Sequence, residues 1–370
     1  MIFIPLFKVF MAESASAALA PVLHSGYLAS GTQVRTFEAG LAEWLGVPKV
    51  AATCDASAAL TMALTLAGVQ PGDEVITSPI ACAATLMPIA NLFARPVWCD
   101  IDPMTGMMDP GKIEELISEK TRAILLYHWS GDVGDSAGLA ALAAKHGIKL
   151  IEDAHAALGA QHQGKRLGAI ADFTVYSFYA TKHITSGGEG GALIAADARD
   201  LEQALRLRRF GIDTASFRLP GGDLNPRFDI PVAGFNFPMN EVAATLGIEG
   251  LRHINEIVAR HRSNGLFYEK ALANIPGVSQ LRRRPDCVSA YWTYSLLAER
   301  RDDLIRKLNA HGIGAQRLHM RHDQYSCFEA ASDALPGVAR FDAENVSIPC
   351  GWWVDEEDRA RVLACLRDGW

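Results

Sequence analysis

The chain has 370 residues, 49% of them hydrophobic and 21% charged, a composition typical of a globular protein long enough for two domains. A formal net charge of -7 excludes the basic surface that nucleic-acid phosphates require, so we expect no nucleic-acid partner. The seven cysteines form no CxxC pair and no zinc-spaced cluster with histidine, which predicts reduced thiols and no metal.

The apolar N-terminal run is interrupted by Pro5 and Lys8, and no later stretch approaches the ~18 apolar residues of a membrane span. We therefore expect a cytoplasmic protein that is neither secreted nor inserted in a membrane.

Short apolar runs alternate with helical patterns from residue 48 onwards. We expect strands within 49–54, 71–78, 96–102, 122–129 and 148–153, and helices from 58, over 83–93, over 112–117 and over 136–147. Such an alternation predicts an α/β fold with a mostly parallel sheet covered by helices on both faces. Ligands bind at the carboxyl ends of the strands in these sheets.

The pattern changes near residue 240. A long helical stretch over 240–272 is followed by strands within 289–298, a helix over 301–312 and a last helix from Asp355. These elements predict a smaller α+β domain over 246–370 after a large domain over 1–245. The first ~14 residues are expected to pack on the small domain, and loops are predicted at 220–222 and 225–231.

One lysine, Lys182, lies between an aromatic strand end and a glycine cluster in SFYATKHITSGGEGG, residues 177–191. A lysine amine is a covalent catalyst when it is held against a carbonyl group, which pyridoxal phosphate supplies. Asp153, at a strand end, is suited to keep the cofactor's pyridine nitrogen protonated. Ser57, at a helix start, and Ser177 are suited to hold its phosphate. Each residue alone has an ordinary structural explanation, but one cofactor requires all four in this order.

These stretches resemble the DegT-type (DegT/DnrJ/StrS) sugar aminotransferase family, within the fold-type I pyridoxal phosphate enzymes. The resemblance covers nearly the whole chain, and S-F-x-x-T-K followed by G-E-G-G is its most specific motif. Other matching stretches are PLFKVFM, SGYLASGTQVRTFEAGLAEWLGV, IEDAHAALGA and GFNFPMNEVAATLGIEGL. The resemblance implies the fold-type I architecture and transfer of an amino group from an amino acid, expected to be L-glutamate, to a nucleotide-linked keto-deoxysugar.

The resemblance also implies roles for individual residues. Lys182 would be the Schiff-base lysine, and Asp153 would be the partner of the pyridine nitrogen. The phosphate would be held by the amides and hydroxyls of Ala56, Ser57 and Ser177. Asn236, in GFNF, would reach the phosphate of the neighbouring subunit, which implies a homodimer with shared active sites. The simpler alternative is that Asn236 caps the helix that begins near residue 239.

The chain departs from the family pattern near the cofactor. Cys82 stands where an aromatic side chain commonly stacks on the cofactor ring. Ala156 occupies a position that is often Gln or His, and His155 is expected either to replace that cofactor contact or to act from a second layer. Candidates for substrate binding are Tyr27, His319 and Arg321.

Two other functions remain open at this stage. A sugar dehydratase of the same family, dependent on pyridoxamine phosphate, would carry histidine at the lysine position, so Lys182 argues against it. A regulatory or binding protein that has lost catalysis is favoured only by Cys82. The sequence does not distinguish a nucleotide-linked sugar from another ketone or aldehyde as the acceptor.

Overall fold

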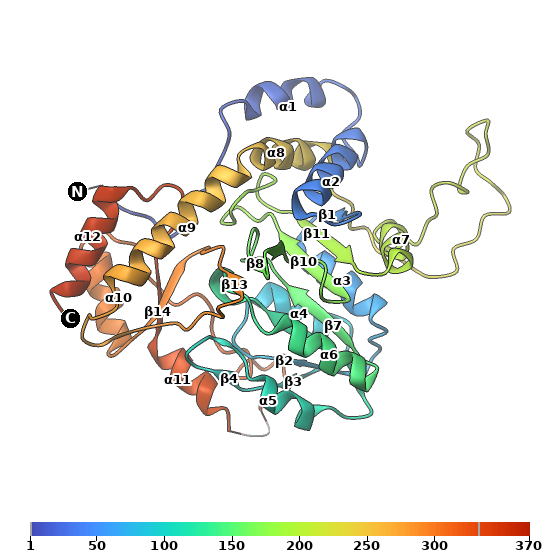
Figure 1. Cartoon of the computed structure of the whole chain (residues 1–370). Helices are drawn as coiled ribbons and strands as arrows, with labels where there is room; N and C mark the ends of the chain where they lie inside the picture. Colours follow the sequence, from blue (N-terminus) through green and yellow to red (C-terminus); the bar gives the residue numbers. More distant parts are fainter. Residues whose placement is uncertain (1, 332–333) are drawn as a thin grey trace.

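A mostly parallel seven-stranded sheet lies at the centre of the computed structural model, which describes residues 2–331 and 334–370 (Figure 1). The strand order is β1–β11–β10–β7–β6–β2–β3, and β11 alone runs against its neighbours. The strands are β1 (Ala51–Thr53), β2 (Glu74–Thr77), β3 (Arg95–Trp98), β6 (Thr121–Tyr127), β7 (Lys149–Asp153), β10 (Phe173–Ser177) and β11 (Gly191–Ala195). The predicted sheet is confirmed.

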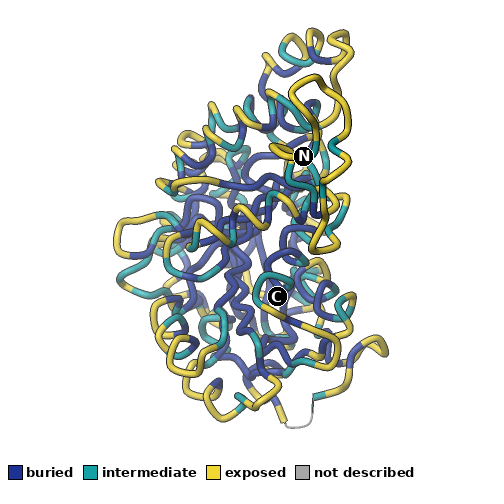
Figure 2. The backbone as a smooth tube through the Cα atoms, turned by 90° about the vertical axis from the view of Figure 1, so that its right-hand side faces the viewer, coloured by how far each residue is buried: buried dark blue, intermediate teal, exposed yellow. Residues whose placement is uncertain are grey.

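Helices cover both faces of this sheet because its strands are apolar on both sides. Along β6, Ala123, Leu125 and Tyr127 enter one hydrophobic cluster, whereas Ile124 and Leu126 enter another. The first cluster also contains residues of α3 (Ala56–Leu66), α4 (Ala83–Asn91) and α7 (Ala198–Leu207). On the opposite face lie α6 (Ser136–His146), α2 (Thr32–Leu45) and α8 (Glu241–Arg252). The buried backbone accordingly fills the middle of Figure 2.

Side chains at the helix starts fix where several of these helices begin. The carboxylate of Asp55 accepts a hydrogen bond from the Ala58 amide at 2.7 Å, so α3 starts directly after β1. Asp135 and Asp197 cap α6 and α7 in the same way. The short connection from β1 to α3, where Asp55 lies, borders the candidate site.

A further hydrophobic cluster forms a smaller α+β unit at the C-terminal end of the chain. The unit comprises the antiparallel strands β12 (Val278–Gln280), β14 (Tyr294–Ala298) and β15 (Asn345–Ile348) with α9 (Ile254–Ala271), α10 (Arg301–Ala310) and α12 (Glu356–Arg367). Ile4 lies in this cluster and pairs with Ile313, so the N-terminal segment runs along the smaller unit. The helix α11 (Pro336–Glu344) contacts β14, but its buried Val338 and Phe341 belong to the cluster on the sheet.

The helical stretch predicted over 240–272 is divided at His253 into α8 and α9. The predicted domain boundary at 245/246 falls inside α8, and the division into two domains stays a prediction. The remaining short elements are α5 (Pro110–Ile113), the 3₁₀ turns η1 (Glu114–Leu116) and η2 (Trp129–Gly131), β4 (Ile101–Asp102), β5 (Met107–Met108), β8 (Gln161–His162), β9 (Lys165–Arg166) and β13 (Cys287–Val288).

The segment between α7 and α8, residues 208–240, is called the arm below. Its two ends pair with each other and with β1, and its middle part extends away from the rest of the chain (Figure 1). It exposes Leu219, Leu224 and Val232, of which Leu224 is 60% accessible.

The N-terminal helix α1 (Ala15–Leu23) packs on α8. Neither it nor any other helix in the described part of the chain combines the length and apolar character needed to cross a bilayer.

Candidate active site

A cavity of about 590 Å³ opens at the carboxyl ends of β7 and β10, beside the starts of α3 and α4. It is lined by Asp55, Ala56, Ser57, Leu60, Cys82, Ala84, Asp153, His155, Ser177, Tyr179, Lys182 and Glu189. Its volume is that of a typical small-molecule site. The structure therefore brings together every cofactor-binding candidate except Asn236, at the strand ends where the sequence places them.

Asp153 lies at the end of β7 and is fully buried. Its Oδ1 accepts hydrogen bonds from the backbone and Nδ1 of His155 at 3.1 and 2.9 Å, and its Oδ2 accepts one from the Thr85 hydroxyl at 2.6 Å. Burial alone would raise the pKa of this carboxyl, but these partners together hold the pKa below its ordinary value. Asp153 is therefore a buried carboxylate at neutral pH.

His155 connects this carboxylate to an aromatic cluster. Burial lowers the pKa of the imidazole, so the ring is neutral, donates from Nδ1 to Asp153 and leaves Nε2 unprotonated. The ring stacks on Tyr127, with centroids 4.8 Å apart and planes at 15°. The Tyr127 hydroxyl in turn lies 3.0 Å from Nε2 of His319. His155 thus fixes Asp153 and also reaches the cavity wall.

Lys182 presents a buried amine to the same cavity. Burial lowers the pKa of Lys182 to about 7, although Cys82 and Asp153 act in the opposite direction. A large fraction of the amine is therefore unprotonated near neutral pH, the form that bonds a carbonyl carbon or accepts a proton.

The N-terminus of α3 also lines the cavity. The amides of Ala56 and Ser57 begin the helix, and the Ser57 hydroxyl donates to the Ala84 carbonyl at 3.1 Å. A Cβ on Gly191 would lie 2.4 Å from the Asp55 carbonyl oxygen, so only glycine lets β11 pass this close. An amine, a buried carboxylate and a helix N-terminus around one cavity fit pyridoxal phosphate.

Asn236 lies outside this cavity, exposed on the arm, where its backbone pairs with Arg209. The side chain that caps α8 belongs to Asn240, which accepts a hydrogen bond from the Ala243 amide at 2.8 Å. The alternative that Asn236 caps this helix is therefore wrong.

The three substrate-binding candidates occupy different environments. Tyr27 is 82% exposed between α1 and α2 and does not line the cavity. Arg321 is paired with Asp323, which neutralises its charge. His319 lies next to the cavity through Tyr127 and His155. Of the three, only His319 contacts the aromatic cluster at the site.

Residues that the sequence analysis did not single out also shape this site. Thr85, on the first turn of α4, fixes Asp153, and Trp292 lies against the Lys182 amine. A threonine three residues after Cys82 is a weak signal in the sequence. Trp292 had no such signal, because it precedes β14 and reaches the site only through the packing of the smaller unit on the sheet.

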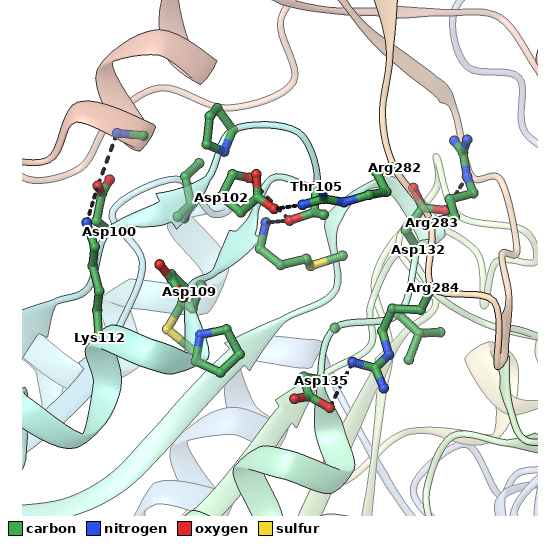
Figure 3. Close-up of a pocket in the computed structure, with 18 of the residues that line it drawn as sticks. Asp100, Asp102, Thr105, Asp109, Lys112, Asp132, Asp135, Arg282, Arg283 and Arg284 are labelled. Atoms are coloured by element: carbon green, nitrogen blue, oxygen red, sulfur yellow. Dashed lines mark hydrogen bonds and ion pairs between the residues drawn. The ribbon is translucent and has the colours of Figure 1, made fainter.

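A larger cavity of about 710 Å³ lies between the sheet and the smaller unit (Figure 3). Three consecutive arginines line this cavity, and each forms an ion pair with a different aspartate. The pairs are Arg282–Asp102, Arg283–Asp132 and Arg284–Asp135. Because each cation already has an anion, we interpret this place as an ion-pair seam, and we call it the seam below.

The chain matches the model of the DegT/DnrJ/EryC1/StrS aminotransferase family over residues 10–367 and belongs to this family. It is 32% identical to GDP-perosamine synthase of Caulobacter vibrioides over 349 residues, which cover 91% of this chain and 90% of the relative. Two crystal structures superpose with a TM-score of 0.93 and 35% identity: AtS13 from Actinomadura melliaura, with 100% of both chains covered, and the sugar aminotransferase CalS13 from Micromonospora echinospora, with 99% and 100% covered.

The predictions of family, fold, aminotransferase activity and cofactor are thereby confirmed. The protein is an aminotransferase of the fold-type I architecture that uses pyridoxal phosphate.

Proposed function

We propose that this aminotransferase moves an amino group from L-glutamate to the keto group of a sugar linked to a nucleoside diphosphate. The name of one relative denotes a GDP-linked sugar, and CalS13 is described as a sugar aminotransferase. The observation that carries the chemistry is the Lys182 amine and the Asp153 carboxylate in one buried cavity.

Pyridoxal phosphate supplies an electron-accepting ring and a carbon that carries the amino group between the two substrates. The Asp153 carboxylate, which His155 and Thr85 hold ionised, would keep the pyridine nitrogen protonated. Lys182 would hold the cofactor through its amine, and the same amine, when free, would carry the proton that leaves the substrate's α-carbon. The amides and hydroxyls of Ala56, Ser57 and Ser177 would hold the phosphate.

The neighbouring histidine supports amino transfer over dehydration. His183 donates from Nε2 to the Ala290 carbonyl at 3.0 Å, and its ring lies 4.5 Å from that of His261. It is buried and does not line the cavity, so it is not placed to replace Lys182.

The acceptor can be identified with protein loaded with pyridoxamine phosphate. We expect such protein to convert one or more members of a panel of nucleotide-linked keto sugars to amino sugars, detected by mass. The control panel contains the same ketones without the nucleotide, together with simple 2-oxo acids. Amination of the simple ketones alone would overturn the proposed acceptor.

We also propose that two subunits complete each site. Among the described residues that line the cavity, Lys182 is the single lysine or arginine, whereas Asp55, Asp153 and Glu189 are carboxyl groups. A phosphate dianion next to these groups requires more donors, because a buried charge is stable only when it is paired and hydrogen-bonded. The exposed arm carries Asn236 together with Arg209, Arg218 and Arg227, which suit a partner's anionic site.

A subunit-mixing experiment tests this sharing. Lys182→Ala protein and Asn236→Ala protein, each weakly active, are combined under conditions that exchange subunits. If Asn236 acts in the partner's site, each mixed dimer contains one intact site, and activity partly returns. If Asn236 acts in its own subunit, every site carries one defect, and no activity returns. Mixing the Lys182→Ala protein with itself is the control.

A further inference from the structure

The indole ring of Trp292 lies directly against the amine of Lys182. The Lys182 Nζ atom is 3.6 Å from the centroid of this ring, and both side chains are buried. Trp292 lies in the connection between β13 and β14, so it approaches the amine from the side of the smaller unit. A buried ammonium over an indole face is a strong form of cation–π contact.

The indole is fixed from several directions. Its Nε1 donates to the carbonyl of Thr181, the residue before Lys182, at 2.7 Å. Phe7 stacks on the ring, with centroids 4.9 Å apart and planes at 25°. His155 meets it edge-on at 6.2 Å. The ring is thus tied to the backbone next to the lysine and supported by the N-terminal segment.

This arrangement has a consequence for the two forms of the amine. Burial disfavours the ammonium form of Lys182, and the indole face favours it, because the negative face of the ring attracts a cation. The neutral amine gains much less from the same contact. Trp292 therefore stabilises the ammonium form of Lys182, the form that is present after the amine has taken up a proton.

We propose that Trp292 is a positioning residue of the amino transfer, whose indole face receives the freed Lys182 amine and holds it after it has taken the substrate's proton, with Phe7 supporting the ring. The inference rests on the proposed role of Lys182 as the proton carrier. The active site would then include Trp292, a residue of the smaller unit. It would also depend on the N-terminal segment, because Phe7 supports the indole ring.

The first measurement uses protein freed of the cofactor. Competitive labelling with acetic anhydride over a range of pH, followed by mass spectrometry, gives the apparent pKa of Lys182. The other titratable groups near the amine, which all variants keep, are Cys82, Asp153, His155, His183 and His319. We expect Trp292→Leu to lower the pKa of Lys182 by about one unit. Trp292→Phe keeps an aromatic face against the amine and should lower this pKa by much less. Phe7→Leu is expected to give a smaller shift in the same direction.

The matched control is Trp370→Phe, because Trp370 also donates from its indole to a backbone carbonyl, that of Glu299, but it lies away from the lysine. An unchanged Lys182 pKa in folded Trp292→Leu, or an equal shift in Trp370→Phe, would overturn the proposal. If the leucine variant does not fold, an unchanged pKa in both Trp292→Phe and Phe7→Leu overturns it equally.

The second measurement uses the loaded enzyme. Trp292→Leu is expected to lower kcat about tenfold with little change in KM, and Trp292→Phe is expected to restore most of kcat. A loss confined to KM contradicts the proposal. Borohydride reduction and peptide mapping are carried out in parallel. A cofactor adduct on another lysine would refute the proposed function itself, whereas an adduct on Lys182 with an unshifted pKa refutes only the role of Trp292.

Discussion

The two cavities of this molecule differ in how their charged side chains are paired. In the seam, each of the three arginines has at least one carboxylate partner: Arg282 pairs with Asp102, Arg283 with Asp132 and Glu269, and Arg284 with Asp135 and Asp286. In the cofactor cavity, the Lys182 amine rests on an aromatic ring, and Asp153 is held by Thr85 and a neutral His155. A satisfied ion pair has little to offer a ligand, whereas a buried amine without a counter-ion partner is chemically available.

The larger cavity is therefore not the catalytic one. The seam is expected to matter for stability and the cofactor cavity for chemistry, and substitutions in the two places should separate these effects.

The largest effect is expected from Lys182→Ala, which removes both the covalent attachment of the cofactor and the proton carrier. Turnover should fall by at least about 10³-fold. Borohydride reduction of the unmodified protein should place the cofactor on Lys182 in a peptide map. The exposed Lys165 provides the control variant, Lys165→Ala, which should keep full activity. Retained turnover in Lys182→Ala would contradict the assignment.

The next effect is expected on stability, from Arg283→Leu in the seam. Arg283 pairs with Asp132 at 2.9 Å and with Glu269, and its guanidinium lies over Tyr291. Removing one partner of a buried ion pair leaves uncompensated charge, so the free energy of unfolding should fall by about 3–5 kcal/mol, measured by denaturant titration.

Arg282→Ala is the matched control, because its side chain is 68% exposed and its pair with Asp102 is solvated. This substitution should lower the free energy of unfolding by less than about 1 kcal/mol. Equal losses of unfolding free energy in the two variants would show that burial does not determine how much these ion pairs stabilise the protein.

A smaller effect on rate is expected from Asp153→Asn, which keeps the shape of the side chain but removes its charge. The cofactor should stay bound while turnover falls by about 10²-fold, because the pyridine nitrogen loses its anionic partner. Asp102→Asn, in the seam, removes a carboxylate that does not contact the cofactor cavity and should leave the rate unchanged. Turnover near that of the unmodified protein in Asp153→Asn would show that this carboxylate has been misassigned.

The sequence predicted the part of the site that local structure determines. Asp153, Ser177 and Lys182 follow strand ends, and Ser57 begins a helix, so the parallel-sheet rule was sufficient to place them together. Trp292 was missed because it reaches Lys182 only when the smaller unit packs on the sheet, a contact between residues 110 positions apart for which the sequence has no periodic signal.

The cap of α8 was missed for a different reason. Asn236 and Asn240 both precede the helix, and the sequence alone does not decide which backbone turns into it. In the same way, Tyr27 and Arg321 were chosen by resemblance, but their exposure and pairing depend on the packing around them.

The smallest effect is expected in the stability of the protein freed of cofactor, through the pH dependence that Lys182 introduces. Its pKa is about 7 in the folded chain and near its ordinary value of 10.5 in the unfolded chain. Between these values the unfolded chain binds one more proton, so the free energy of unfolding rises with pH across this window.

Below about pH 7 both states are protonated, and the cost of burying the ammonium is fully present. Lys182→Met, which has no such group, should therefore be more stable than the unmodified protein by on the order of 2 kcal/mol near pH 6. The difference should shrink steadily towards about pH 10. Denaturant titrations of both proteins at several pH values measure it, with Lys165→Met as the control that should show no trend. A constant difference across this range would mean that the Lys182 amine is not destabilised as an ammonium by its burial, and that the cofactor cavity tolerates this charge as well as the seam tolerates its own.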